Sequence, residues 1–172
     1  MSGRDREITL RFLAEPTDVN FGGKVFGGSV MKWIDHAGYA CASGWAGRYC
    51  VTAYVGGIQF EHPIAIGDLV ETRARVLMTG RTSMHIAVDV YSRAPIAEEY
   101  ARTTHCLMVF VAVDEAGHPV PVPSWQPQTA ADQAQAEYAA RMKALSLEIE
   151  AERARMQSPG RPVGSGQAGS HS

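Results

Sequence analysis

The chain has 172 residues, which is enough for one full domain and too few for two ordinary ones. Hydrophobic residues make up 45% and charged residues 20%, a globular composition that excludes an intrinsically disordered chain. The formal net charge is only -2, so no overall positive field attracts polyanions, and we expect no nucleic-acid partner.

The cysteines and the N-terminus indicate the compartment. The three cysteines, Cys41, Cys50 and Cys106, are an odd number without C-x-x-C spacing, and residues 1–12 lack the apolar stretch of a signal peptide. We therefore expect reduced thiols and a cytoplasmic location. The longest apolar run, residues 106–113, is far shorter than the roughly 20 residues of a membrane-spanning helix, so we expect no membrane segment.

The first predicted elements are a strand and a long helix. Apolar and polar residues alternate over residues 8–12, which predicts a half-buried strand. Residues 27–47 then carry apolar side chains at helical spacing. A helix of about 18–20 residues is roughly 27–30 Å long, and this one has so little polar surface that we expect it to be enclosed.

Four further strands are predicted after this helix. Residues 52–60 form a strand softened by two adjacent glycines, and residues 70–76 and 84–90 alternate between apolar and polar side chains. Residues 106–113 are apolar on both faces, as in a central or an interface strand. Because the connections are not βαβ repeats, we predict an α+β fold, with a five-stranded antiparallel sheet wrapped around one long central helix.

The chain is expected to divide into a domain at 1–127, a helical extension at 128–156 and a disordered tail at 157–172. The extension has no Gly or Pro, and Thr129 with Asp132 resembles a capping box. The tail is rich in Gly and Ser and cannot bury much apolar area. The larger apolar side chains of the extension form a narrow stripe suited to packing on a partner surface or another helix: Tyr138, Met142, Leu145 and Ile149.

The start of the central helix is the first candidate site. Gly27 and Gly28 stand where this helix should begin, and the free N–H groups of a helix start can stabilise a carbonyl oxygen that becomes negative. The alternative role of these glycines is to permit a tight turn and close packing. Asn20, just upstream, carries an amide that could hold a water or a carbonyl, or could simply form the turn.

Asp35 lies about two turns into the helix, on the margin of its apolar face. An ionised carboxylate there is costly unless it is paired or hydrated. One hypothesis is that Lys32, His36 or an N–H near the helix start satisfies it. The other is that Asp35 is a general base or nucleophile facing a cleft, because a carboxylate with oxyanion donors is what acyl transfer requires.

The segment between the strands at 70–76 and 84–90 contains Gly80, Arg81, Thr82 and Ser83. A hairpin turn needs a glycine in any case, but an arginine with two hydroxyls also suits a phosphate. The six histidines have no metal-binding spacing, and no Walker loop, dinucleotide fingerprint or G-x-S-x-G elbow occurs. We expect no metal site.

Four separated motifs in this order resemble the acyl-CoA thioesterases of the hotdog superfamily. The motifs are PTDVNFGGKVFGGSVMKWIDHAG, IQFEHPIAIGDLV, TGRTS and HCLMVFVAVD, within a resemblance that runs from about residue 8 to residue 123. The resemblance implies a hotdog fold and hydrolysis of the acyl-coenzyme A thioester to a free acid and coenzyme A. It implies no metal and no cofactor other than the coenzyme A of the substrate, and it suggests a role in fatty acid metabolism.

The resemblance also implies roles for particular residues. Asp35 matches the catalytic carboxylate, which would activate water or attack the thioester directly, and Asn20 matches a position that assists at the same centre. The backbone N–H of Gly28 would polarise the thioester carbonyl. The positions expected to contact substrate or coenzyme A are Gly27, Gly80, Arg81, Thr82 and Ser83.

A partner chain is expected, because the predicted sheet leaves edge strands and a second face to cover. We expect at least a homodimer, and the resemblance implies that Asn20 and Gly28 of one subunit face Asp35 of the other, with a hexameric trimer of dimers as the larger assembly. Three alternatives remain: a non-catalytic acyl-CoA-binding module, a hotdog dehydratase or hydratase, and an interaction protein using the C-terminal helix. In a hydratase His36 could not simply pair with Asp35, because adjacent helix residues point about 100° apart.

Overall fold

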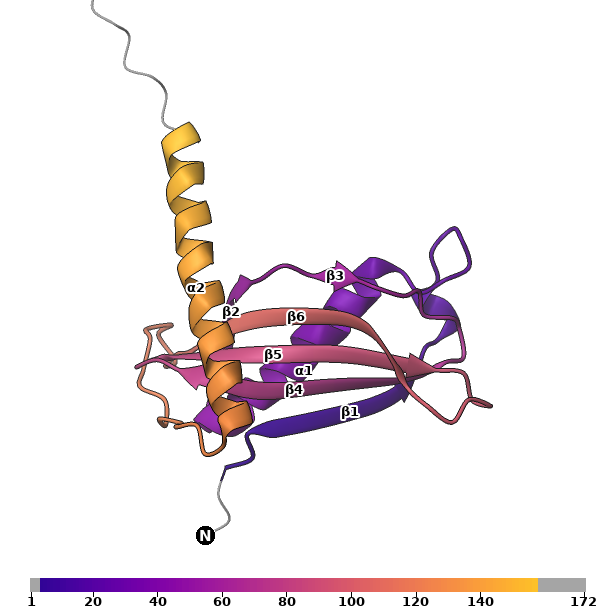
Figure 1. Ribbon diagram of the computed structural model, residues 1–172, viewed down its shortest axis with the longest axis horizontal. Helices are drawn as coiled ribbons and strands as arrows, with labels where there is room; N and C mark the ends of the chain where they lie inside the picture. The colour runs from indigo at the N-terminus through magenta and orange to yellow at the C-terminus, as the bar shows by residue number, and fades with distance from the viewer. Residues whose placement is uncertain (1–3, 158–172) are drawn as a thin grey trace, which may run out of the picture.

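The computed structural model describes residues 4–157. Its strands form one antiparallel sheet in the order β1-β4-β5-β6-β2, with β3 also pairing with β6. Figure 1 shows α1 behind this sheet and α2 across its front. The elements are β1 (Glu7–Leu13), η1 (Pro16–Asp18), α1 (Gly27–Ala46), β2 (Cys50–Val55), β3 (Gln59–Phe60), β4 (Leu69–Thr79), β5 (Ser83–Arg93), β6 (Ala101–Ala112) and α2 (Ala130–Gln157).

The predicted fold is confirmed, but the sheet has six strands and not five. The segment predicted as one strand at residues 52–60 is divided into β2 and β3, and the pairs with β6 stop at Val55 and resume at Gln59. Gly56 lies between the two pieces and donates its N–H to the carbonyl of Leu107 at 2.7 Å. A Cβ at Gly56 would lie 3.0 Å from that carbonyl oxygen, so the glycines allow a close approach that interrupts the regular ladder.

Helix α1 packs one face against the sheet, whereas we expected it to be enclosed; its other face is open in the described residues, and Met31 there is 47% exposed. Gly38 lies so close to β6 that a Cβ there would be 2.8 Å from the Phe110 ring. The helix ends where Gly47 adopts a left-handed backbone, φ 69°, and donates its N–H to Ser43. The inward side chains of the three central strands, all buried, form the opposite wall of this core: Val70, Ala74, Val76, Met84, Ile86, Val88, Val90, Cys106, Met108, Phe110 and Ala112.

Helix α2 covers part of the outer face of the sheet. Leu77, Ala87 and Leu107 form a second apolar cluster there with Ala139, and Met142 packs against it. Leu107 belongs to the segment 106–113, which is apolar on both faces, and we expected a partner chain to cover its outward side chains. In the structure, α2 of the same chain covers Leu107. Further along the predicted stripe, the side chain of Ile149 is 58% exposed.

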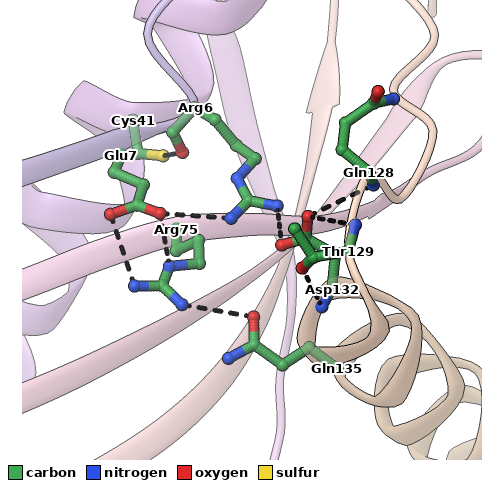
Figure 2. Close-up of polar contacts among 8 residues, drawn as sticks. All are labelled: Arg6, Glu7, Cys41, Arg75, Gln128, Thr129, Asp132 and Gln135. Carbon is green, nitrogen blue, oxygen red and sulfur yellow. Dashed lines mark hydrogen bonds and ion pairs between the residues drawn. The ribbon is translucent and has the colours of Figure 1, made fainter.

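The N-terminus of α2 has the predicted capping box. Thr129 Oγ1 accepts the N–H of Asp132 at 3.1 Å, and Asp132 Oδ2 accepts the N–H groups of Thr129 and Gln128 at 3.1 and 3.2 Å. Arg6 donates to Asp132 Oδ1 at 2.6 Å and so ties α2 to the segment before β1 (Figure 2). Of the predicted tail at 157–172, only Gln157 lies within the described residues, where it is the last residue of α2.

Candidate active site

Two backbone donors stand at the start of α1. Ser29 and Val30 donate their N–H groups to the carbonyl of Phe26, whereas within residues 4–157 the N–H groups of Gly27 and Gly28 have no acceptor. A Cβ at Gly28 would lie 2.2 Å from the Phe26 ring, so a side chain there would displace that ring. The helix start therefore combines free donors with the positive end of the helix dipole.

Asn20 organises the loop that leads to this helix start. Its Oδ1 accepts the N–H groups of Gly22 and Lys24 at 2.8 and 3.2 Å, so the predicted turn-forming role is present. Its amide nitrogen has no partner in the described part of the chain. Asn20 and Gly27 line the same cavity of about 350 Å³, together with apolar side chains such as Ile64.

Asp35 has a partner that sequence analysis missed. Its Oδ1 accepts a hydrogen bond of 2.7 Å from Thr52 Oγ1 on β2, and neither Lys32 nor His36 bonds to it in residues 4–157. Its second carboxylate oxygen accepts no hydrogen bond there, and the side chain is half-buried. No local pattern singled out Thr52, because the contact exists only once β2 is placed beside α1.

Within one chain, the N–H of Gly28 and the carboxylate of Asp35 lie apart. Gly28 and Asp35 are about two turns apart, which is roughly 10 Å along the helix axis. A thioester carbonyl bound at the N–H of Gly28 is therefore out of reach of the Asp35 carboxylate in the same chain. Asp35 also does not line the cavity that contains Asn20 and Gly27.

The segment between β4 and β5 is a hairpin turn, as predicted. Gly80 donates its N–H to the carbonyl of Ser83 at 2.9 Å, and the carbonyl groups of Arg81 and Thr82 accept N–H groups from Val122 and Ala112. The exposed Arg81 guanidinium forms no ion pair or hydrogen bond with any described residue. It is therefore available to an anion.

The turn between β4 and β5 lies near Thr52, at the same end of the sheet. Thr52 pairs with Phe110 of β6, and Phe110 pairs with Met84, which is next to Ser83 at the start of β5. Three adjacent strands separated by about 4.8 Å span roughly 10 Å. The structure thus brings the turn and the Asp35–Thr52 pair to the same end of the sheet.

The cysteines are unsuited to nucleophilic attack. Burial raises the pKa of Cys41 and Cys106 to about 12 and that of Cys50 to about 11, so neutral thiols predominate at pH 7. Residues 4–157 contain no group of three or more His, Cys, Asp or Glu side chains arranged to hold a metal ion. No helix in the same part of the chain is long and apolar enough to cross a bilayer.

Comparisons with known proteins agree with this architecture. The model of the thioesterase superfamily matches residues 22–99. The acyl-CoA thioester hydrolase YciA of Salmonella typhimurium is 39% identical over 121 residues, which cover 68% of this chain and 90% of that protein. An apo-hexameric acyl-CoA thioesterase of known structure is 33% identical with a TM-score of 0.79, over 92% of this chain and 98% of the other.

A hexameric broad-specificity acyl-coenzyme A thioesterase, solved with an aspartate replaced by alanine, is 32% identical with a TM-score of 0.64. The alignment covers 77% of this chain and 93% of that one. Because the alignment with the apo-hexameric enzyme covers 92% of this chain, it extends into α2. The family resemblance is confirmed: the chain belongs to the acyl-CoA thioesterases of the hotdog fold, a family of thioester hydrolases.

Proposed function

We propose that this enzyme hydrolyses acyl-coenzyme A to a free carboxylic acid and coenzyme A, with Asp35 as the catalytic carboxylate. The observation that carries the assignment is a half-buried aspartate on an otherwise apolar face of α1, with one oxygen held by Thr52 and the other free of protein partners among the described residues. The hydrogen bond to Thr52 fixes the orientation of the carboxylate and leaves one oxygen for chemistry.

Two routes are open to this carboxylate. As a general base, Asp35 removes a proton from water while the water oxygen attacks the carbonyl carbon; the C–S bond then breaks, and the coenzyme A thiolate recovers the proton. As a nucleophile, the carboxylate oxygen forms an acyl anhydride and expels the thiolate. Water then hydrolyses the anhydride, which releases the free acid and regenerates the carboxylate, and the thiolate takes up the proton that the water gives off. In both routes negative charge develops on the carbonyl oxygen. Removal of an oxyanion donor typically costs about 10²–10³ in rate.

The complete site needs two chains in this proposal. Because Gly28 and Asp35 of one chain are roughly 10 Å apart along α1, Asn20 and Gly28 of one subunit would act with Asp35 and Thr52 of another. The unpaired side of β2, which carries Thr52, is the edge at which a second sheet can be added. Exposed apolar side chains on both parts support this pairing: Val51 and Val55 on β2 and Phe21 on the glycine-rich loop.

The coenzyme A portion would lie at the turn between β4 and β5. The exposed Arg81 guanidinium and the hydroxyls of Thr82 and Ser83 provide donors for phosphate oxygens. The hexameric thioesterases with similar chains support a further association of dimers into a trimer of dimers.

The proposal is tested by thiol release from a panel of acyl-coenzyme A substrates. The Asp35→Asn variant should lose about 10²–10⁴ in kcat, the usual contribution of a general acid or base, while its thermal stability stays near wild type. Asp114→Asn, on an exposed turn, is the matched control and should be fully active. Wild-type turnover by Asp35→Asn would remove this carboxylate from the mechanism, and binding of acyl-coenzyme A by the wild-type chain without thiol release would favour the non-catalytic alternative.

A further inference from the structure

A second cavity, of about 210 Å³, lies between α2 and the outer face of the sheet, and we call it the α2 cavity. Figure 1 shows α2 in front of the sheet and α1 behind it. The α2 cavity is therefore on the face opposite α1, and neither Asn20, Gly28 nor Asp35 lines it. Its apolar walls come from β6 and α2: Leu107, Val109, Met142 and Leu147.

His85 of β5 brings an unpaired polar atom to the α2 cavity. The residue lines the cavity and is 3% exposed, and within residues 4–157 its Nδ1 has no hydrogen-bond partner. A buried polar atom without a hydrogen bond is destabilising, and native proteins leave few of them. The Nδ1 of His85 is therefore a hydrogen-bonding group available to a ligand in the cavity.

Lys143 of α2 adds a positive charge at the same place. It lines the cavity, and among residues 4–157 its ammonium group forms no ion pair or hydrogen bond. Burial, and then the nearby Lys143, lower the pKa of His85 to about 4, so the ring is neutral at pH 7. A neutral ring with its proton on Nδ1 can donate to an anionic oxygen that the ammonium group also contacts.

Glu150 gives the α2 cavity an opposite charge at its other end. Glu150 lines the cavity two turns after Lys143, which is roughly 10 Å along the helix axis. An anionic group is therefore favoured beside His85 and Lys143 and disfavoured at the far end. An apolar cavity of about 150 Å³ binds benzene. The α2 cavity, with about 210 Å³, thus holds a ligand of roughly six to eight carbon atoms.

We propose that the α2 cavity binds a free monocarboxylic acid of roughly six to eight carbon atoms. Its carboxylate accepts hydrogen bonds from His85 Nδ1 and Lys143 Nζ, and its hydrocarbon body packs against the apolar walls from β6 and α2. The site is separate from the proposed active site, and the inference does not depend on the chemistry at Asp35.

Calorimetric titration of the full-length chain with sodium octanoate tests the class of ligand. One octanoate per chain should bind saturably. 1-Octanol has no charge to pair with Lys143, and octanedioate brings a second carboxylate towards Glu150. Each should bind at least roughly 10-fold more weakly than octanoate.

Two substitutions test the polar end of the α2 cavity. Lys143→Met and His85→Phe should each raise the Kd for octanoate roughly 10- to 100-fold, because each removes a hydrogen bond to a charged group. Arg141→Met, at an exposed position of the same helix outside the cavity, is the matched control and should bind as the wild type does. In the wild-type chain, octanoate should shift the ring ¹⁵N resonances of His85 and leave those of the exposed His118 unchanged.

Three results would overturn the inference. Equal affinity for octanoate and 1-octanol would show that the cavity does not recognise a carboxylate. No saturable binding, with the His85 resonances unchanged, would mean that water alone satisfies Nδ1. Displacement of octanoate by free coenzyme A would place the cavity within the proposed coenzyme A site, because Ser83 of that turn also lines the cavity.

Thiol release separates this inference from the proposed function. Lys143→Met should hydrolyse acyl-coenzyme A at the wild-type rate while it loses octanoate binding. An equal loss of both in this variant would contradict a separate site. Inactivity of the wild-type chain towards acyl-coenzyme A with octanoate binding intact would refute the proposed hydrolysis and support the acid site.

Discussion

The two helices are held to the sheet by different physical means. Nine residues of α1 are buried, whereas α2 is longer and buries only Asp132 and Ala139. Burial of apolar area therefore positions α1, and a hydrogen-bonded cap with an ion pair to Arg6 positions the start of α2. Asp35 is the one carboxylate on the largely apolar α1, whereas polar and charged residues occur along the whole of α2.

The two helices therefore differ in how firmly the sheet holds them. The rigid, core-packed α1 can hold Asp35 and the N–H of Gly28 at fixed places, which is what a catalytic site needs. Helix α2 rests on a small second cluster and is expected to open locally at lower cost than the core. The following experiments test this contrast, beginning with the largest expected effect.

Subunit mixing tests whether α1 supplies halves of two sites. Asn20→Ala chains and Asp35→Asn chains should each be nearly inactive, and refolding them together should restore about a quarter of wild-type thiol release. Random assortment makes half of the dimers mixed, and each mixed dimer has one intact site of two. Mixed dimers that form without regaining activity would show that each chain carries a complete site.

The pH dependence of stability tests the burial of His85, which lies on the outer face of the sheet beneath α2. Burial, and to a lesser degree Lys143, lowers the pKa of His85 from 6.5 to about 4, so the folded state favours the neutral ring. The unfolded chain binds the proton more readily, and stability should therefore fall by about 3 kcal/mol as the pH falls from 6.5 towards 4.

The measurement is urea unfolding at pH 7 and pH 4.5. Relative to wild type, His85→Phe should lose less stability over this interval, because it lacks the titrating ring. His118→Phe, at an exposed position, is the control and should follow the wild-type pH dependence. Equal slopes for wild type and His85→Phe would contradict the proposed cause.

Substitution of Arg81 tests binding of the coenzyme A portion separately from the hydrolysis step. Arg81→Ala should raise KM for acyl-coenzyme A by roughly 10- to 100-fold, because a hydrogen bond between charged groups contributes about 1.5–3 kcal/mol. Its effect on a truncated thioester without the nucleotide should be small. Arg48→Ala, an exposed arginine just after α1, is the control; equal losses on both substrates would assign Arg81 a structural role.

The experiment with the smallest expected effect on the stability of the whole domain removes the Asp132 carboxylate, which anchors the start of α2. The hydrogen bond from Arg6 lowers the pKa of Asp132, so this contribution is present above the unfolded value near 3.9 and is lost as the pH falls through the folded value. Asp132→Asn should speed hydrogen exchange in the first turns of α2 and leave that of α1 unchanged. Gly38→Ala is the converse control, because its added Cβ meets Phe110 in the core and should destabilise the whole domain. Faster exchange of α1 in Asp132→Asn would refute the separation of the two helices.

Local patterns in the sequence determined the elements and several of the residues. Alternation predicted the strands, helical spacing predicted α1, and the pair Thr129–Asp132 predicted the cap of α2, because each depends on side chains within a few residues of one another. The family motifs identified the thioesterase, and the free donors at Gly27 and Gly28 follow from a helix that begins there.

Only the tertiary structure decided which distant groups meet. Thr52 is the partner of Asp35 because β2 lies beside α1. The predicted single strand at 52–60 is divided by the close approach of Gly56 to β6, and α2 covers part of the outer face for which we expected a partner chain. Each of these contacts joins segments far apart in the chain. Their geometry depends on how the sheet orders its strands, and the spacing of residues along the sequence carries no record of that order.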